Sequence, residues 1–270
     1  MILLSFFNFT NYKFDLKNNP KIMGILNLTP DSFSDGGKWN SFEKAIARAE
    51  EIEQEGADFL DIGAQSTRPG YEAVSADEEW NRLEKVIKVI KNKVKIPVSV
   101  DTFYPEVAEK AAYYGADIIN DITGCENNRM FEIAKTYSCG IVINHNYETL
   151  DIKSFFEKKL SQATEYNIKP CQICFDPGIG FKKSRVQDGY IIKNLQKFKL
   201  PQNPMLIGVS RKRIVGKCCG NPPPCERMPG TIAANTIAVL NGADIVRVHD
   251  VKESVQALKV TKFINNIDTV

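Results

Sequence analysis

Polar and charged side chains recur at one kind of position in this chain, at or just after the end of a short apolar run. Asp101 ends Val98–Asp101, Asn120 follows two isoleucines, and Arg247 lies within Ile245–Val248. In α/β barrels the carboxyl ends of the strands converge on one face, where the active site forms. If the apolar runs are parallel strands, these side chains meet in a single site.

One group of these residues can bind phosphate. Arginine forks match phosphate oxygens, and hydroxyl, imidazole and amide groups add further hydrogen bonds. An amide carbonyl oxygen also suits Mg²⁺, which keeps several waters and bridges to phosphate. The members of this group are Asn27, Thr67, Arg68, Arg247 and His249.

A second group mixes carboxylates with an amide and an amine. Facing one ligand, such groups suit a flat heterocycle with several N–H donors and ring acceptors. Its members are Asp101, Asn120, Asp176 and Lys212. Taken singly, an aspartate such as Asp35, Asp121 or Asp250 often just caps a helix or shapes a turn. The combination, rather than any one residue, therefore carries the prediction of a site.

The elements that must position these groups alternate along the chain. A length of 270 residues is usual for one α/β barrel. Helix-length amphipathic patterns begin at Ser41, span Ala76–Asn92 and start again at Pro105, a favoured first helical residue. Alternating strands and helices indicate βαβ units. The predicted strands are Ile22–Leu28, Phe59–Gly63, Val98–Asp101, Ile118–Asp121, Ile141–Asn144, Ile173–Asp176, Met205–Val209 and Ile245–Val248.

A short repeat favours a closed barrel over an open sheet. Gly-Ala-Asp occurs at 56–58, 115–117 and 242–244, each time between a predicted helix and the next predicted strand. Each glycine is expected just past a helix end, in the left-handed conformation. An open doubly wound sheet is the alternative, but no Gly-x-Gly-x-x-Gly turn follows the first strand to favour it.

Composition argues against several classes of function. The 35 basic and 33 acidic residues are interspersed, which does not indicate a nucleic-acid surface. Met1–Phe9 is apolar but too short to span a bilayer and has no basic flank. Seven cysteines without a secretory signature favour a reduced, cytoplasmic setting. The pair Cys171 and Cys174 is interpreted as structural thiols, since two histidines in the whole chain argue against a complete zinc site.

Seven motifs in order carry a resemblance that spans residues 21–262. The first is Met-Gly-Ile-Leu-Asn-Leu-Thr-Pro-Asp-Ser-Phe-Ser-Asp-Gly-Gly at 23–37. Ser-Thr-Arg-Pro-Gly, Ser-Val-Asp-Thr, Ile-Asn-Asp, Phe-Asp-Pro-Gly-Ile-Gly-Phe, Ser-Arg-Lys and Arg-Val-His-Asp follow. With these motifs the chain closely resembles the dihydropteroate synthases of the pterin-binding family.

The resemblance implies a fold, a reaction and a set of partners. The fold is a (β/α)8 TIM barrel formed as a single domain by residues 21–270. Residues 1–20 form an N-terminal segment that we expect to cover the barrel bottom. The reaction condenses 6-hydroxymethyl-7,8-dihydropterin diphosphate with p-aminobenzoate, giving 7,8-dihydropteroate and diphosphate in folate biosynthesis. The expected partners are these small molecules and a second copy of the chain in a homodimer, with no nucleic acid and no membrane.

The resemblance also implies residue roles, with Mg²⁺ as the cofactor beside Asn27. The residues carried over as catalytic are Asp101, Asp176, Lys212, Arg247 and His249. The pterin is expected to contact Asp101, Asn120, Asp176 and Lys212, and the diphosphate Asn27, Thr67, Arg68, Arg247 and His249. The p-aminobenzoate pocket, where sulfonamides compete, is expected to include Phe33, Asp35, Thr67, Pro69, Phe181 and Arg213.

The chain departs from the family pattern at a few places. Gln65 stands where the family usually has Glu, and Asn144 stands where many relatives place a methionine against the pterin. The Cys- and Pro-rich segment 216–230 does not match; it either touches the p-aminobenzoate entrance or covers the surface. Two other functions are considered, a methyltetrahydrofolate-dependent corrinoid methyltransferase and a non-catalytic pterin-binding module. The methyltransferase does not need Ser-Thr-Arg-Pro-Gly and Arg-Val-His-Asp. The binding module would be expected to have lost some catalytic groups, whereas only Gln65 and Asn144 depart from the pattern here.

Overall fold

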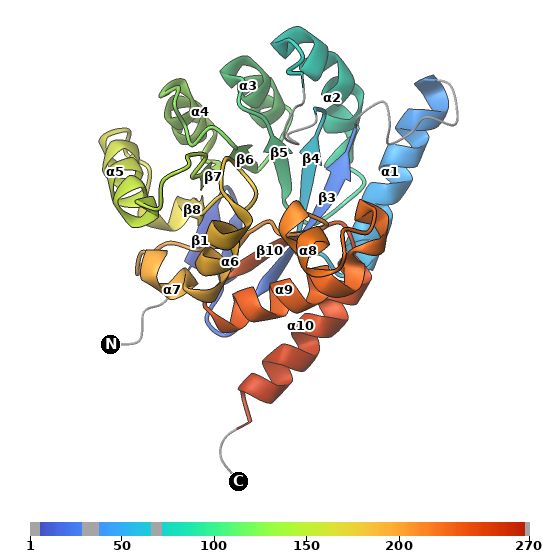
Figure 1. Ribbon diagram of the computed structural model, residues 1–270. Coiled ribbons are helices and arrows are strands. Elements are labelled where there is room, and N and C mark those ends of the chain that lie inside the picture. Colours follow the sequence, from blue (N-terminus) through green and yellow to red (C-terminus); the bar gives the residue numbers. More distant parts are fainter. Residues whose placement is uncertain (1–5, 29–37, 66–71, 268–270) are drawn as a thin grey trace.

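Eight parallel strands form a barrel at the centre of the molecule (Figure 1). The computed structural model describes residues 6–28, 38–65 and 72–267, and for 38–41 the backbone alone. The strand order is β8-β7-β6-β5-β4-β3-β10-β9, and a parallel bridge between Phe175 and Met205 closes the ring. The predicted closed barrel is confirmed. The strands are β3 (Lys21–Asn27), β4 (Phe59–Gly63), β5 (Val98–Asp101), β6 (Ile118–Asp121), β7 (Gly140–Asn144), β8 (Ile173–Asp176), β9 (Leu206–Ile207) and β10 (Ile245–Val248).

Helices surround the barrel, and the expected helix signals are present. Ser75 caps its helix by accepting a hydrogen bond from the backbone N–H of Glu78, and Pro105 stands at the start of the next helix. The first helix begins at Lys38 rather than Ser41. No helix in the described part of the chain is long and apolar enough to cross a membrane. The helices are α1 (Lys38–Gln54), α2 (Ala76–Ile90), α3 (Pro105–Tyr113), α4 (Arg129–Tyr137), α5 (Ile152–Glu165), α6 (Arg185–Lys193), α7 (Leu195–Phe198), α8 (Arg213–Cys218), α9 (Met228–Leu240) and α10 (Val251–Asn265), with short 3₁₀ turns at Pro170–Gln172 and Pro224–Glu226.

The seventh barrel strand is shorter than the sequence predicts. The pairing of β9 ends at Ile207, although the apolar run continues to Val209. A Cβ atom at Gly208 would lie 3.8 Å from the Lys212 amine, and Arg211 has a positive φ of 58°. The chain therefore leaves the sheet after Ile207 and turns, with the backbone N–H of Lys212 donating to the Val209 carbonyl at 3.1 Å.

The Gly-Ala-Asp repeat forms the same structure three times. The glycines have φ values of 99°, 100° and 104°, and each following alanine donates its N–H to a carbonyl five residues back. This is the hydrogen-bond pattern of a glycine-terminated helix. Each aspartate then accepts from the backbone N–H of a strand residue, Asp58 from Ile22, Asp117 from Val98 and Asp244 from Met205, at 2.8–2.9 Å. The repeat thus ends one helix and fastens the start of a strand.

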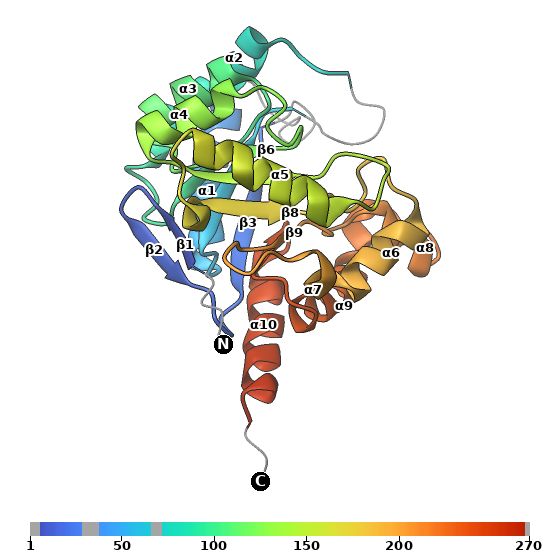
Figure 2. The same ribbon diagram turned by 90° about the vertical axis from the view of Figure 1, so that its left-hand side faces the viewer.

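The N-terminal hairpin packs against the amino ends of the strands (Figure 2). It consists of β1 (Phe6–Phe9) and β2 (Tyr12–Asp15). Phe7 and Phe9 are buried against Phe59, and a Cβ at Gly140 would lie within 3.0 Å of their rings. Inward-facing residues at this end of the barrel are apolar, among them Ile118 and Val142. Because side chains alternate along a strand, the next inward positions lie two residues further on.

Candidate active site

The inward positions at the carboxyl ends of the strands are polar. Two residues beyond Phe59, Ile118, Val142, Cys174 and Ile245, the chain places Asp61, Asn120, Asn144, Asp176 and Arg247. All but Arg247, which is half-buried, are at most 6% exposed. Five of the predicted site residues lie outside the described part of the chain: Phe33, Asp35, Thr67, Arg68 and Pro69.

Arg247 bridges two carboxylates across the barrel. Its Nε donates to Asp61 Oδ2 at 2.5 Å, and one terminal nitrogen donates to Asp101 Oδ2 at 2.6 Å. Burial lowers the pKa of the guanidinium, but Asp61 and Asp101 more than offset this, and the net pKa is raised. The arginine therefore stays charged in the barrel interior.

Carboxyl groups outnumber cations among the described side chains that face inward at this end of the barrel. Among the described residues this group, which we call the floor, holds the three carboxyl groups of Asp61, Asp101 and Asp176 and the two cations Arg247 and Lys212. Burial raises the pKa of Asp101 to about 7, although the Arg247 charge opposes the shift. Asn120 donates from its side-chain nitrogen to Asp61 Oδ2 at 3.2 Å. The floor therefore attracts a proton, an N–H donor or a cationic centre.

Asp176 and Lys212 lie together on the opposite side of the floor. Asp176 Oδ1 accepts from the backbone N–H of Gly178 at 2.8 Å, and the Lys212 amine donates to the Ile179 carbonyl at 2.5 Å. The same amine lies 4.5 Å from the centre of the Phe181 ring. Burial raises the pKa of Asp176 and lowers that of Lys212 to about 8. Lys212 thus remains largely charged at neutral pH and can donate to a ring acceptor.

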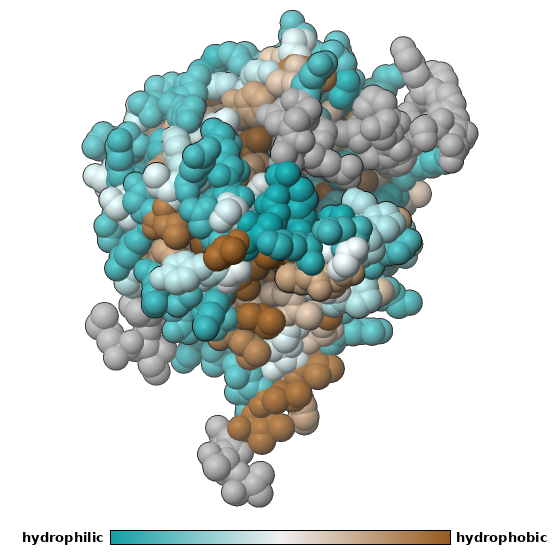
Figure 3. Space-filling model, viewed as in Figure 1, coloured by the Kyte–Doolittle hydropathy of each residue, from teal (hydrophilic) through white to brown (hydrophobic). Residues whose placement is uncertain are grey.

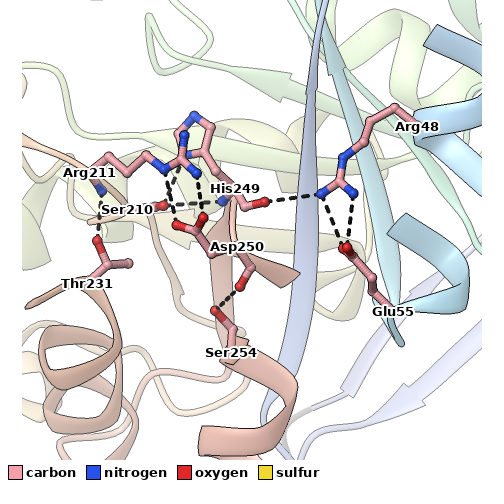
Figure 4. Close-up of polar contacts among 8 residues, drawn as sticks. All are labelled: Arg48, Glu55, Ser210, Arg211, Thr231, His249, Asp250 and Ser254. Carbon is pink, nitrogen blue, oxygen red and sulfur yellow. Dashed lines mark hydrogen bonds and ion pairs between the residues drawn. The ribbon is translucent and has the colours of Figure 1, made fainter. Parts of the chain in front are cut away.

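His249 follows β10 at the edge of the barrel mouth, which we call the rim, and is held there by Ser210 from the loop after β9 (Figure 4). Its Nδ1 lies 2.9 Å from Ser210 Oγ, which also accepts from the His249 backbone N–H at 3.2 Å. When the hydroxyl donates to Nδ1, the neutral ring carries its proton on Nε2. Arg48 binds the His249 carbonyl at 3.4 Å. The imidazole is therefore fixed from both its backbone and its ring.

The loop after β9 is fastened to the end of β10. Arg211 forms a two-pronged ion pair with Asp250, and its backbone N–H donates to Thr231 Oγ1 at 3.0 Å (Figure 4). Arg227 from the Cys- and Pro-rich segment donates to the Arg211 carbonyl at 3.0 Å. These contacts hold Lys212, which follows Arg211, in its half-buried position.

Asn27 supplies the only protein oxygen that we expected to bind a metal. Asn27 is half-buried at the end of β3. A Cβ atom at Gly63 would lie 3.8 Å from the side-chain oxygen of Asn27 and 3.4 Å from the Cβ of Asp101, so the three residues lie close together. No cluster of three or more His, Cys, Asp or Glu side chains that could hold a metal ion occurs among the described residues. An amide oxygen with substrate phosphate and waters is still a donor set that fits Mg²⁺.

Sequence reasoning missed Asp61 and placed Arg247 only at the phosphate. The structure places Arg247 between Asp61 and Asp101, so this side chain also belongs to the carboxylate floor. A carboxylate inside the otherwise apolar strand Phe59–Gly63 is the signal that could have revealed Asp61. Arg213, predicted near p-aminobenzoate, is exposed at the start of α8.

Together these groups can hold a planar ring with N–H donors on the floor and an anion beside the rim. If a bond between them breaks into a carbocation-like centre and a leaving anion, the carboxyl groups of the floor can stabilise the first and Arg247 the second.

Known proteins share this arrangement of strands over most of the chain. A family model described as pterin binding enzyme matches residues 23–249. The dihydropteroate synthase of Clostridium beijerinckii is 41% identical over 261 residues, which covers 93% of this chain and 97% of that protein. The structure of Xanthomonas albilineans dihydropteroate synthase with 4-aminobenzoic acid has a TM-score of 0.91 at 34% identity, covering 98% of this chain and 100% of that one. Yersinia pestis dihydropteroate synthase with a sulfonamide drug has a TM-score of 0.89 at 34% identity, covering 97% and 100%.

Proposed function

The chain belongs to the pterin-binding enzyme family, among its dihydropteroate synthases, and we propose how its residues divide the work of that reaction. It is a transferase of folate biosynthesis. It condenses 6-hydroxymethyl-7,8-dihydropterin diphosphate with p-aminobenzoate to give 7,8-dihydropteroate and diphosphate. The bond from the pterin methylene to the diphosphate oxygen breaks, a bond to the arylamine nitrogen forms, and the nitrogen loses one proton.

The carboxylate floor binds the pterin ring. The observation that carries this proposal is the row of buried polar side chains on adjacent strands, with one more carboxylate than cations. The 2-amino and ring N–H groups of a pterin are donors, which carboxylates accept strongly in a buried site. Lys212, half-buried with a lowered pKa, donates to a ring acceptor. The pterin contacts are Asp101, Asn120, Asp176 and Lys212.

The rim takes the leaving diphosphate. Arg247 and His249 lie at the end of β10. Thr67 and Arg68 are assigned to the same anion from sequence alone, and Asn27 is assigned to it from its position at the end of β3. Positive charge grows on the pterin methylene as negative charge grows on the diphosphate, so Asp101 and Asp176 stabilise the first and Arg247 the second. Since Arg247 bridges Asp61 and Asp101, its charge is already oriented before substrate arrives. The catalytic residues are Asp101, Asp176, Lys212, Arg247 and His249.

Mg²⁺ completes the anion site beside Asn27. When bound, it supplies Lewis-acid stabilisation of the diphosphate charge. The amide oxygen of Asn27 would hold it, with the remaining ligands from the diphosphate and water. The protein groups around it orient the diphosphate through hydrogen bonds.

The p-aminobenzoate site lies on the far side of the methylene from the diphosphate. Phe181 and the Lys212–Arg213 region line its described part, and Phe33, Asp35, Thr67 and Pro69 are assigned to it from sequence. The arylamine is a weak nucleophile that needs positioning more than a strong base, so no residue is assigned as general base. Sulfonamides are expected to compete with p-aminobenzoate here, as the Yersinia pestis sulfonamide complex supports.

Two further properties concern the whole molecule. A homodimer is supported by apolar side chains exposed on α9 and α10, namely Ile237, Leu240, Val260, Phe263 and Ile264, together with Ile267 just beyond (Figure 3).

A cytoplasmic setting is supported by seven cysteines that are all free thiols. We further propose that residues 1–20 form an N-terminal segment outside the barrel domain of residues 21–270.

The test of the reaction is release of diphosphate from pterin diphosphate. We expect release to depend on p-aminobenzoate and on Mg²⁺, and to be inhibited by a sulfonamide in competition with p-aminobenzoate. A corrinoid methyltransferase would release none, and a binding module would bind the pterin without turnover. A folded sample that binds both substrates and releases no diphosphate would contradict the proposal.

The role of Arg247 is tested by replacing its side chain. We expect Arg247→Ala to lower kcat about 10²–10³-fold, as for loss of one group that stabilises transition-state charge, and to raise the KM for pterin diphosphate. Removal of the cation leaves Asp61 and Asp101 unpaired, which costs stability of about 3–5 kcal/mol, so Arg247→Lys is measured beside it. Arg129→Ala, an exposed arginine on α4, is the control. Near-normal turnover in both Arg247 variants would remove Arg247 from the mechanism.

A further inference from the structure

Lys183 has a buried amine that the proposed reaction does not use. It lies between β8 and α6 and is 5% exposed. The amine donates to three backbone carbonyl oxygens, those of His145 at 2.7 Å, Gly178 at 3.3 Å and Phe181 at 3.5 Å. An ammonium group that is removed from water needs such hydrogen bonds in place of its hydration. The three carbonyls therefore compensate for the burial of this cation.

The three carbonyls belong to two neighbouring loops. His145 follows β7, whereas Gly178 and Phe181 follow β8. The backbones of the two loops meet here, since the His145 N–H donates to the Asp176 carbonyl at 2.8 Å and a Cβ at Gly178 would lie 2.2 Å from the His145 carbonyl oxygen. The Lys183 amine thus joins the two loops at the point where they touch.

Gly178 links the buried amine to a carboxyl group of the floor. Its N–H donates to Asp176 Oδ1 at 2.8 Å, while its carbonyl accepts from Lys183. Glycine has more backbone freedom than any other residue, so the direction of its N–H depends on what else holds the peptide groups around it. The contact with Lys183 limits how far Gly178 can turn its N–H away from Asp176.

The charge of Lys183 acts on the same carboxyl group. Burial lowers the pKa of Lys183 to about 8, and the charge of Asp176 opposes this shift. Burial likewise raises the pKa of Asp176, and the charges of Lys212 and Lys183 are among the causes that oppose it. Lys183 therefore stays largely charged at neutral pH and favours the ionised form of Asp176.

We propose that Lys183 is a positioning residue of the pterin site, whose amine ties the loops after β7 and β8 together and so keeps Asp176 oriented and ionised. Lys183 acts through Asp176 and has no contact of its own with the pterin. The inference rests on the proposed pterin site.

The test is a double-mutant cycle between Lys183 and Asp176, measured as affinity for 6-hydroxymethyl-7,8-dihydropterin diphosphate in calorimetry. Lys183→Met keeps the length of the side chain and removes its charge and its donors. We expect it to weaken binding about tenfold in the otherwise wild-type protein, a coupling typical of residues in one network. In the Asp176→Ala background the same change should weaken binding less than twofold, because no carboxylate is left to orient.

Two further variants complete the cycle. Lys182→Met makes the same substitution at the exposed neighbouring lysine and should keep pterin affinity within twofold. Lys183→Gln keeps a donor for the carbonyls without the charge, and it replaces Lys183→Met in the same cycle if that variant does not fold.

The outcomes separate the role of Lys183 from the proposed site. An equal loss of affinity in both backgrounds would show that Lys183 stabilises the fold without acting through Asp176, and it would overturn the proposal. Full affinity in the single Lys183 variant would overturn it as well. If Asp176→Ala itself keeps wild-type affinity, the proposed pterin site is wrong and the role of Lys183 falls with it.

Discussion

Glu79 on α2 has a buried carboxyl group that lies next to Thr102, the residue after Asp101 of the floor. It is fully buried, and Thr102, the residue after Asp101, donates its hydroxyl to Oε2 at 2.8 Å. Oε1 has no partner among the described residues. The Gln65 amide lies near enough to affect the carboxyl but forms no hydrogen bond of normal geometry. Burial raises the pKa of Glu79 to about 7, and the charge of Asp101 adds to the shift.

This shift predicts how stability depends on pH. In the unfolded chain Glu79 ionises near 4.5, whereas in the folded protein it keeps its proton until about pH 7. Below 4.5 both states are protonated, so Glu79 makes no pH-dependent contribution there. From 4.5 to 7 stability falls as pH rises, by an amount on the order of 3 kcal/mol, and then stays level. Glu79→Gln should abolish this part of the fall.

The measurement is urea unfolding of wild type and Glu79→Gln at several pH values between 4 and 8, at one protein concentration. We expect the variant to be the more stable of the two above pH 7, with the difference shrinking towards pH 4.5. Glu84→Gln, exposed on the same helix, is the control and should follow the wild-type curve. A difference between wild type and Glu79→Gln that does not change with pH would show that Glu79 ionises normally in the folded protein.

At the residue scale, the sequence predicts groups that follow local rules and misses groups that depend on distant partners. Asp101, Asn120 and Asp176 end apolar runs, and the structure places each at an inward, buried position. The Arg247–Asp61 ion pair joins residues 186 positions apart, and nothing local to either residue signals it. Glu79 lies in a helix whose other acidic residues are exposed or half-buried, and the contact that marks its burial, the hydrogen bond from Thr102, comes from a residue 23 positions away.

At the scale of elements, the loop after β8 depends on one glycine. Gly178 has a φ of 74°, and a Cβ there would lie 2.2 Å from the carbonyl oxygen of His145. Its N–H orients Asp176, and its carbonyl accepts from the Lys183 amine at 3.3 Å. The backbone of β7 and the β8 loop can approach this closely only because no side chain separates them.

We therefore expect Gly178→Ala to damage both stability and the pterin site. The strained φ and the clash with backbone should cost about 2–4 kcal/mol in unfolding free energy. Pterin affinity should fall because the backbone must shift to relieve the clash, which moves the N–H of residue 178 away from Asp176. Gly189→Ala is the matched control, since Gly189 lies inside α6 with nothing within 4 Å of the added methyl. That variant should gain about 0.5–1 kcal/mol. Equal stabilities for the two variants would show that the close approach at Gly178 is not a constraint.

Elements were predictable where their signals are local. The alternation of apolar runs and helical patterns predicts the eight strands, and Gly-Ala-Asp predicts three helix ends. The motif alone does not predict the role of its aspartate, which accepts a hydrogen bond from the backbone N–H of a residue at the start of another strand. The early end of β9 was not predictable, because the apolar run continues to Val209 while the strand pairing ends at Ile207.

At the scale of the whole molecule, the last helix does not stay on the barrel. The second half of α10 projects away from the body of the protein (Figures 1 and 2). This half carries Val260, Phe263 and Ile264, which are 58–71% exposed, and α9 beside it exposes Ile237 and Leu240. Apolar side chains gathered on one surface commonly mark a protein interface. A second copy of the chain fits, because symmetric dimers bring the same patch from both partners together.

The dimer is tested by one charge in this patch. We expect wild type to sediment as a dimer at micromolar concentration and Phe263→Glu to sediment as a monomer, because ionised carboxylates cannot be buried in an apolar interface without a partner. Tyr113→Glu is the control, since Tyr113 is 70% exposed on α3, away from the patch, and should stay dimeric. The monomer should keep its pterin affinity, because every floor residue comes from one chain. A monomeric wild type, or a Phe263→Glu variant that dimerises as tightly as wild type, would exclude α9 and α10 as the interface.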